Sequence, residues 1–464
     1  MSLLADFCVR ILSMSRLFKP FDYEATLDSN VRLGDCLPQT HLARFIVDIV
    51  AQLDLKDLYA AYGKRGGAPY APQMMIALLF YAYATGVFAS RKIEQATKET
   101  ASFRFLAGNY SPDHDTIAAF RKQFLPQIKE LFVQILMFAK EMGLLELGTI
   151  SIDGTKVHAD ASKSKAVSYK RLLEIEQLLR VEIEQLLALA DKADSAVPEG
   201  MDIPEELLRR EDRLKRLAEA KVVLEERAAE RHALEMAEYE AKMAARAQKE
   251  QETGKKPGGK PPAPPTPGPK DGDQYNFTDP ESRIMKNSRD DGFSQQYNAQ
   301  AAVSYGSRLI VGYSLSNHAN DQQEVAPTLS NIPEELGKAK AASLDTGYFS
   351  KKNIDALETD EVVPYIATGR SEHNQGWQAY FAEAGEAPSE DASAKEKMAY
   401  KLRTEAGKAI YRLRKCTVEP VFGIIKETMG FRQFSLRGQS NATGEWCLVC
   451  LAYNLRRLHV LQGA

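Results

Sequence analysis

The chain has 464 residues, of which 44% are hydrophobic and 27% are charged, so it can form buried cores for two or three domains. The formal net charge of −3 argues against a basic protein that coats a polyanion over its whole surface. The charge is unevenly spread, however. Residues 401–437 hold nine basic and three acidic side chains, whereas residues 170–250 hold 15 basic and 20 acidic ones. We therefore expect any polyanionic partner to meet the C-terminal part of the chain.

The N-terminal residues 1–36 predict a tail rather than a secretion signal, because they lack a long apolar core and a small-residue cleavage site. The longest apolar runs, such as residues 74–87, are too short to span a bilayer. An odd number of cysteines, five, suits a reducing compartment. Cys447 and Cys450 form a CxxC without the further ligands that zinc needs, so we interpret them as buried helical thiols. The sequence thus predicts a soluble, cytoplasmic protein without a membrane partner.

Residues 37–145 predict a compact helical domain. Their apolar residues recur at the i, i+3, i+4 spacing of amphipathic helices. Pro72 suits the first turn of one helix, and Ser90 suits the N-cap of the next. Asp113 or Asp115 is placed to cap a later helix.

The pattern changes twice after residue 145. Residues 146–167 include the short β-branched run TISIDGTKVHA, which predicts a strand that ends in a turn at Asp153 and Gly154. Residues 168–252 are rich in Ala, Glu, Leu, Lys and Arg, and predict two long helices, broken near residues 197–204, that form a hairpin or coiled coil. Residues 253–273 are a Pro- and Gly-rich linker.

Strands return in residues 274–440. We predict a β-hairpin around Tyr305 and Gly306, a helix over 320–332, and a short strand that ends at Asp345. A helix, a strand and a helix that carries Glu419 follow, and residues 441–464 predict a C-terminal helix. A five-stranded mixed sheet with flanking helices accounts for this order, with the helical hairpin inserted after the first strand. A series of independent small domains is the less economical alternative.

This topology indicates that three acids could lie close together. If the strands of Asp153 and Asp345 are neighbours, their carboxylates project from the same edge, and Glu419 lies on a helix across it. Three such charges need cations to offset their repulsion, and oxygen ligands favour Mg²⁺ or Mn²⁺. Most of the 63 acids must nevertheless be solvated, and an Asp beside a Gly is more often a turn residue. The prediction therefore rests on the three positions together, not on any single acid.

Three segments carry a family resemblance. They are SIDGTKVHADAS, LDTGYFS and YRLRKCTVEPVFGIIKETMGFRQFSLRG. They resemble the three motifs of bacterial insertion-sequence transposases of the DDE superfamily, whose last motif has Tyr, Arg, Glu and Lys at near-fixed spacing. Tyr411, Arg414, Glu419 and Lys426 fit it here, with Arg414 one residue further from Glu419 than in the best-known form. The resemblance extends to the helical segment around residues 74–121 and to most of the chain outside the insertion and the first ~35 residues.

The resemblance implies an α/β RNase H-like catalytic domain, formed by residues 146–167 and 274–440, beside an all-α DNA-binding domain at 37–145. It implies that Asp153, Asp345 and Glu419 are catalytic and bind Mg²⁺, for which Mn²⁺ can substitute. It further implies cleavage and strand transfer at the ends of a mobile element. The partners would be double-stranded DNA, as terminal repeats and target, and further copies of the chain in a dimer or higher oligomer, on the bacterial nucleoid.

Several basic residues are candidates for contact with DNA. Lys426 follows Glu419 by about two helical turns, so both share a helix face. Arg414 could grip a phosphate with two hydrogen bonds, and Tyr411 could bond or stack. The alternative interpretation of these side chains is that they form a solvated helix face. For Arg432 and Arg437, contact with DNA and a solvated surface are equally favoured.

Other features favour plainer interpretations. We interpret His158 as a polar loop residue rather than a further metal ligand. The 168–252 insertion is either a solvated arm or a clamp for a second copy or a DNA end. Two alternative functions also remain, a structure-specific DNA nuclease on the same fold and a domesticated or inactive DNA-binding relative.

Overall fold

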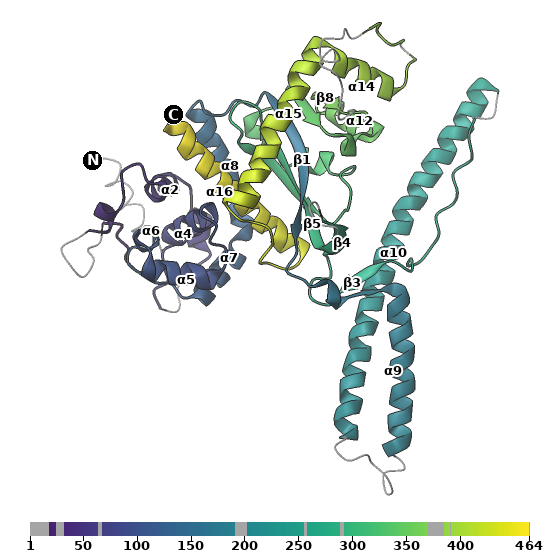
Figure 1. Cartoon of the computed structure of the whole chain (residues 1–464), viewed down its shortest axis with the longest axis horizontal. Coiled ribbons are helices and arrows are strands. Elements are labelled where there is room, and N and C mark those ends of the chain that lie inside the picture. The colour runs from purple at the N-terminus through teal and green to yellow at the C-terminus, as the bar shows by residue number, and fades with distance from the viewer. Residues whose placement is uncertain are drawn as a thin grey trace. The chain divides into compact units, whose positions relative to one another are not determined.

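The computed structural model describes residues 18–24, 32–63, 67–190, 202–254, 258–287, 292–369, 385–389 and 391–463. Much of the predicted N-terminal tail, residues 1–17 and 25–31, lies outside these ranges. The chain divides into two compact units, one formed by residues 1–160 and 284–464 and the other by residues 161–283 (Figure 1).

Short helices fill the N-terminal part of the first unit, as the apolar periodicity predicts. They are η1 Leu33–Cys36, α2 Leu42–Val50, α3 Lys56–Ala60, α4 Pro72–Ala84, α5 Ser90–Glu99, α6 Ala101–Leu106, α7 His114–Gln123 and α8 Leu125–Glu141. Pro72 opens α4 and the Asp113 side chain caps α7, as expected, whereas α5 begins at Ser90 with Ala89 as its N-cap. Every residue of α4 is buried, because other helices surround it.

The C-terminal helix α16, Gln439–Gln462, packs against α4, α8 and the sheet strand β6. Cys447 and Cys450 are buried in it, which confirms their interpretation as helical thiols. A buried polar cluster ties α16 to the N-terminal helices, since the Tyr83 hydroxyl donates to Glu445 Oε1 at 2.8 Å and Arg121 donates to the Tyr83 oxygen at 3.0 Å. The other Glu445 oxygen accepts the backbone N–H groups of residues 435 and 436.

A mixed sheet forms the centre of the first unit, and its described strands number six rather than the predicted five. The order is β4-β5-β1-β7-β8, with β6 also paired to β5. The additional strand is the short β4, which adjoins β5. The strands are β1 Thr149–His158, β4 Arg283–Lys286, β5 Phe293–Ser304, β6 Ile310–Ser316, β7 Ala341–Leu344 and β8 Val363–Ile366.

Pairing directions make the sheet mixed. β5 runs antiparallel to β1 and β6, whereas β7 runs parallel to both β1 and β8. Helix α15, Glu405–Gly423, packs across β1, β5 and β7, and Figure 1 shows it lying over β1. A five-residue π-helical segment, η5 Ile424–Thr428, continues it. A mixed sheet with flanking helices, preceded by a helical region, is compatible with the predicted α/β class.

The remaining described helices of this unit connect the strands. They are α11 Val325–Leu329, η3 Glu334–Leu336, η4 Thr346–Tyr348, α12 Lys351–Thr359 and α14 Ala394–Arg403. The predicted helix over 320–332 is therefore wrong in length. The residues before α11 are held by side-chain bonds to β5 instead, through Asp321, and Pro327 lies within the short helix that does form.

The second unit consists mainly of two helices, α9 Tyr169–Ala190 and α10 Ile203–Thr253. They run antiparallel, because Glu182 pairs with Arg210 and Glu176 pairs with Lys221. Their shared core contains Leu172, Leu179, Leu217, Ala220 and Leu224. Strands β2 Ala166–Ser168 and β3 Gln274–Asn276 pair antiparallel, and a 3₁₀ turn, η2 Lys163–Lys165, precedes them.

Candidate active site

Asp153 lies in the middle of β1, so the predicted turn at Asp153 and Gly154 is wrong. The strand continues to His158 because β5 is long enough to pair with it from Ile150 onwards. In this register Asp153 is opposite Ala301 on β5. The acid is therefore held by a continuous strand rather than by a loop.

Asp345 follows directly after β7, as predicted. The parallel pairing of β1 with β7 places Ser151 opposite Ser343. The pairing ends there, and β7 itself ends at Leu344, so Asp153 and Asp345 each lie two residues beyond this last pair. The two carboxylates are close enough for the charge of Asp345 to raise the pKa of Asp153. The Gly347 N–H donates to Asp345 Oδ1 at 2.8 Å, which fixes the carboxylate at the start of the turn η4. The two aspartates thus lie near each other at the point where β7 ends beside β1.

Arg414 of α15 supplies positive charge to this pair. Its guanidinium NH1 donates to Asp153 Oδ2 at 2.9 Å, and both side chains are largely buried. Burial raises the pKa of Asp153 to about 6, although Arg414 lowers this pKa and the charge of Asp345 raises it. The guanidinium of Arg414 therefore already offsets part of the negative charge of the largely buried Asp153 and the neighbouring Asp345.

Glu419 is exposed on α15. Helix α15 turns Thr417, Val418 and Val421 into the core, so the intervening Glu419 faces solvent. Among the residues that the structure describes, no three His, Cys, Asp or Glu side chains lie close enough together to hold a metal ion. The structure therefore brings the two aspartates together and leaves the third predicted acid apart from them.

Two transposase family models match separate parts of the chain. Residues 264–455 match the family model described as "Transposase DDE domain", and residues 31–123 match the model described as "Transposase domain (DUF772)". The chain belongs to the DDE-type transposases of insertion sequences. No curated protein and no solved structure matches the chain. As a DDE transposase the chain is a metal-dependent enzyme that acts on DNA.

The region that matches the DDE domain contains Asp345 and Glu419. Asp153 lies in neither matched region, because it falls in the interval between them. The place of Asp153 in the transposase site therefore depends on the strand register described above. Separately, no described helix of the transposase is long and apolar enough to cross a membrane.

The predicted DNA-binding residues of the transposase have partners within the chain. Lys426 Nζ donates to the Lys156 carbonyl at 2.8 Å, so this side chain lies against β1. Arg432 pairs with Glu427, and Arg437 Nε donates to Asp160 Oδ2 at 2.8 Å. The side chains of both arginines are nevertheless about half exposed. Tyr411 is half-buried, and burial raises its pKa while Arg414 lowers it.

His158 hydrogen-bonds the Ser294 hydroxyl at 3.0 Å through Nδ1. Its backbone also joins the segment after η5, because Phe434 N–H donates to the His158 carbonyl. His158 is the last residue of β1 and pairs with Gln296 of β5, so its interpretation as a loop residue is wrong.

The sequence analysis missed a set of polar residues beside the aspartate pair. Asp321 accepts hydrogen bonds from the amides of Asn298 and Gln300, and Gln300 in turn accepts one from the hydroxyl of Tyr348. One signal was available, because Asn298 and Gln300 alternate at i, i+2 with the less polar Tyr297, Ala299 and Ala301. Asp321 itself lies before α11, in residues that the sequence analysis assigned to a helix.

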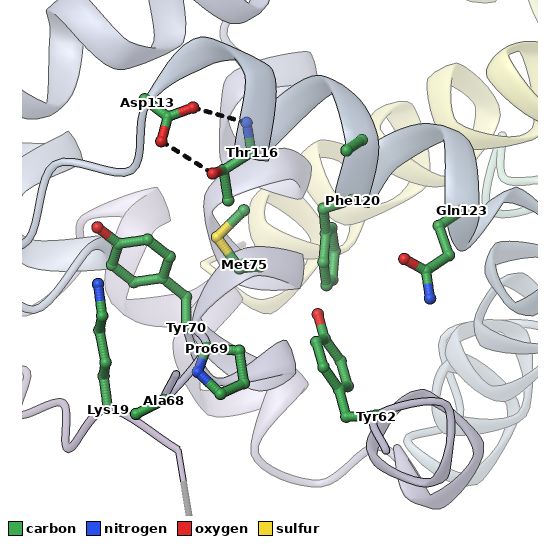
Figure 2. Close-up of a pocket in the computed structure, with 11 residues that line it drawn as sticks. Lys19, Tyr62, Ala68, Pro69, Tyr70, Met75, Asp113, Thr116, Phe120 and Gln123 are labelled. Carbon is green, nitrogen blue, oxygen red and sulfur yellow. Dashed lines mark hydrogen bonds between the residues drawn. The ribbon is translucent and has the colours of Figure 1, made fainter. Parts of the chain in front are cut away.

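A cavity of about 420 Å³ lies elsewhere, among the N-terminal helices (Figure 2). Asp113 accepts from the backbone and hydroxyl of Thr116 at 2.8 and 2.9 Å, and Lys19 Nζ lies 3.9 Å from the centroid of the Tyr70 ring. None of the eight predicted site residues lines this cavity.

Proposed function

We propose that this transposase cleaves phosphodiester bonds at the ends of a mobile element and joins the freed 3′ ends to target DNA. The observation that supports the proposal is the parallel pairing of β1 with β7 in a chain of the DDE family, since Asp153 and Asp345 each lie two residues beyond the last pair of that ladder. In the first step a water attacks the phosphodiester. In the second, the new 3′-hydroxyl attacks target DNA.

The aspartate pair fits Mg²⁺. Its donors are carboxylate oxygens, the ligands this ion prefers, and Mg²⁺ commonly takes one or two carboxylates together with phosphates of the substrate. The ion pair between Arg414 and Asp153 also indicates that the negative charge of the two aspartates is stabilised by a nearby cation. When bound, divalent ions would activate the attacking oxygen and stabilise the leaving one. Mn²⁺, with the same ligand preference, is expected to substitute.

Glu419 is proposed as the third ligand. It lies exposed on α15, the helix whose Arg414 already reaches Asp153, so the same helix crosses the pair. We propose that substrate DNA and bound cation bring Glu419 into the site. This would replace the ion pair between Arg414 and Asp153, and free Arg414 to donate to a phosphate.

The other basic residues are proposed to hold DNA. Tyr411, Arg414, Glu419 and Lys426 would act together as a Tyr-Arg-Glu-Lys third motif on α15 and η5. Lys426 already crosses to the backbone of β1, which places its ammonium beside the strand of Asp153. Arg432 and Arg437 follow with exposed side chains and would contact the DNA backbone.

For the organisation of the chain, we propose an RNase H-like catalytic domain from residues 146–167 and 274–440, with residues 37–145 reading the terminal repeats. Transfer of two element ends requires two active sites, so we propose a dimer or higher oligomer on DNA. The insertion at 168–252 would then be a spacer arm or a clamp within that assembly.

The proposal is tested with purified full-length protein, Mg²⁺ and labelled DNA that carries the element ends. We expect 3′-hydroxyl cleavage products and joined products with the wild type, almost none with Asp153→Asn, and about a hundredfold less with Glu419→Gln. Cleavage without joining would favour a structure-specific nuclease. Binding without cleavage would favour a domesticated DNA-binding relative, and activity in both variants would overturn the site assignment.

A further inference from the structure

Asp321 collects the side chains of two strand residues. Its Oδ1 accepts the amide of Asn298 at 2.7 Å and the amide of Gln300 at 2.9 Å, both from β5. Gln300 also donates to Asn298 Oδ1 at 3.1 Å, so the three side chains bond one another, and Lys156 Nζ lies 3.9 Å from the same oxygen of Asp321. Both amides are buried, and buried donors without an acceptor are costly, so Asp321 fixes their orientation.

This set reaches the turn that carries Asp345. The Oε1 atom of Gln300 accepts the hydroxyl of Tyr348, a fully buried residue three positions after Asp345. A second connection runs through Asn353, whose amide donates to the Tyr348 carbonyl at 2.7 Å and to the Gln322 carbonyl at 2.9 Å. The η4 turn is therefore bound to the segment of Asp321 by two separate routes.

The same set also lies against the backbone beside Asp153. Gly154 is opposite Gln300 in the sheet, and a Cβ atom at Gly154 would lie 2.2 Å from Gln300 Nε2 and 2.9 Å from Asp321 Oδ1. The amide thus fills the space that a side chain at this position would need. Because side chains alternate across a strand, Asp153 projects from the opposite face of the sheet. Asp321 therefore contacts β1 on the face of the sheet opposite to Asp153.

We propose that Asp321 is a positioning residue, which holds Asp153 and Asp345 in register for cation binding through Gln300 and Tyr348. This inference rests on the proposed function, because it assigns the pair to the catalytic cation. Two adjacent carboxylates repel each other, so the strand and the turn that carry them must be fixed from elsewhere. One oxygen of Asp321 accepts both amides, and the acceptor oxygen rather than the negative charge is what the role requires.

The distinction between acceptor and charge gives the test. Asp321→Ala removes the acceptor, whereas Asp321→Asn keeps an oxygen for both amides and removes the charge. Tyr348→Phe removes only the hydroxyl that links Gln300 to the Asp345 turn. Asp355→Asn, an exposed acid on α12, is the matched control. Each full-length variant is examined for Mn²⁺ affinity by electron paramagnetic resonance, for cleavage of element-end DNA, and for thermal unfolding.

We expect Asp321→Ala to weaken Mn²⁺ binding and cleavage by roughly tenfold to a hundredfold, as loss of the groups that orient metal ligands does. We expect Tyr348→Phe to weaken both by about tenfold. Asp321→Asn should stay within about threefold of the wild type, because its amide oxygen still accepts both donors. Asp355→Asn should match the wild type.

Equal losses in Asp321→Asn and Asp321→Ala would overturn the proposal, since they would show that the charge itself is needed. Unchanged Mn²⁺ affinity in Asp321→Ala would overturn it as well. If Asp321→Ala does not fold, Tyr348→Phe decides, and wild-type affinity there contradicts the proposal. A wild type that binds Mn²⁺ but does not cleave DNA rejects only the proposed function. A wild type that binds no Mn²⁺, with or without DNA, rejects both.

Discussion

The aspartate pair and Glu419 belong to one predicted site, but the fold controls them in different ways. Asp153 and Asp345 are placed by backbone register, since a parallel ladder fixes which residues face each other. Glu419 is placed by the rotation of a helix about its axis, and the buried Thr417, Val418 and Val421 direct it to solvent. A strand position thus fixes a proposed ligand in the free protein, whereas Glu419, on a helix, would have to be brought to the pair.

Removal of either aspartate should have the largest effect, and it tests whether the two strand-borne acids form the catalytic unit. Asp153→Asn and Asp345→Asn should each lower the cleavage rate by on the order of a thousandfold or more, because each removes several kcal/mol of charge stabilisation at the cation. The rate is measured on element-end DNA in Mg²⁺, with Asp355→Asn as control. If one of the two variants retains the wild-type rate, the pair is not the catalytic unit.

Replacement of Glu419 should have a smaller effect. We expect Glu419→Gln to lower cleavage by about a hundredfold, since the two aspartates still bind the cation. Glu405→Gln, an exposed acid at the start of the same helix, should leave the rate unchanged. A loss in Glu405→Gln equal to that in Glu419→Gln would mean that charge on α15, rather than the position of Glu419, is what matters.

Gly154 tests how tightly the strand half of the site is packed. Gly154→Ala places a methyl group against Gln300 and Asp321 and should lower the free energy of unfolding by about 2 kcal/mol. Gly148→Ala is the control, because a Cβ there meets no atom within 4 Å. Chemical denaturation measures both. Equal stability of the two variants would show that the amides behind Asp153 move aside freely.

Arg414 tests the competition between an internal cation and a bound one. Arg414→Gln removes the charge that now neutralises Asp153, so Mn²⁺ affinity of the free protein should rise by about tenfold. Cleavage should not rise with it, because Arg414 is proposed to hold a phosphate. Arg412→Gln, on an exposed position of α15, is the control. Unaltered affinity in Arg414→Gln would show that the ion pair does not oppose the metal.

The sequence predicts well what depends on local patterns. Pro72 at a helix start and Asp113 at a helix cap follow from their own chemistry, and the apolar periodicity predicts the N-terminal helices. The position of Asp345 at a strand end was likewise predicted, because a short apolar run followed by the turn-forming residues Asp-Thr-Gly is typical of a strand end.

What the sequence does not reveal depends on pairing over long distances. The apparent turn at Asp153 and Gly154 is a strand because β5, some 150 residues later, pairs with it. Gly154 serves a close approach by Gln300 rather than a turn, and this requires the register to be known. Asp321 belongs to the site only through its bonds to β5, so no local pattern indicates it.

The most direct test of the account is a Mn²⁺ titration of the free protein, followed by electron paramagnetic resonance, and repeated with element-end DNA. The account predicts that the free wild type binds Mn²⁺, that Asp153→Asn and Asp345→Asn lose this binding, and that Glu419→Gln weakens it only when DNA is present. If Glu419→Gln abolishes binding in the free protein, or if both aspartate variants bind like the wild type, the central claim is contradicted.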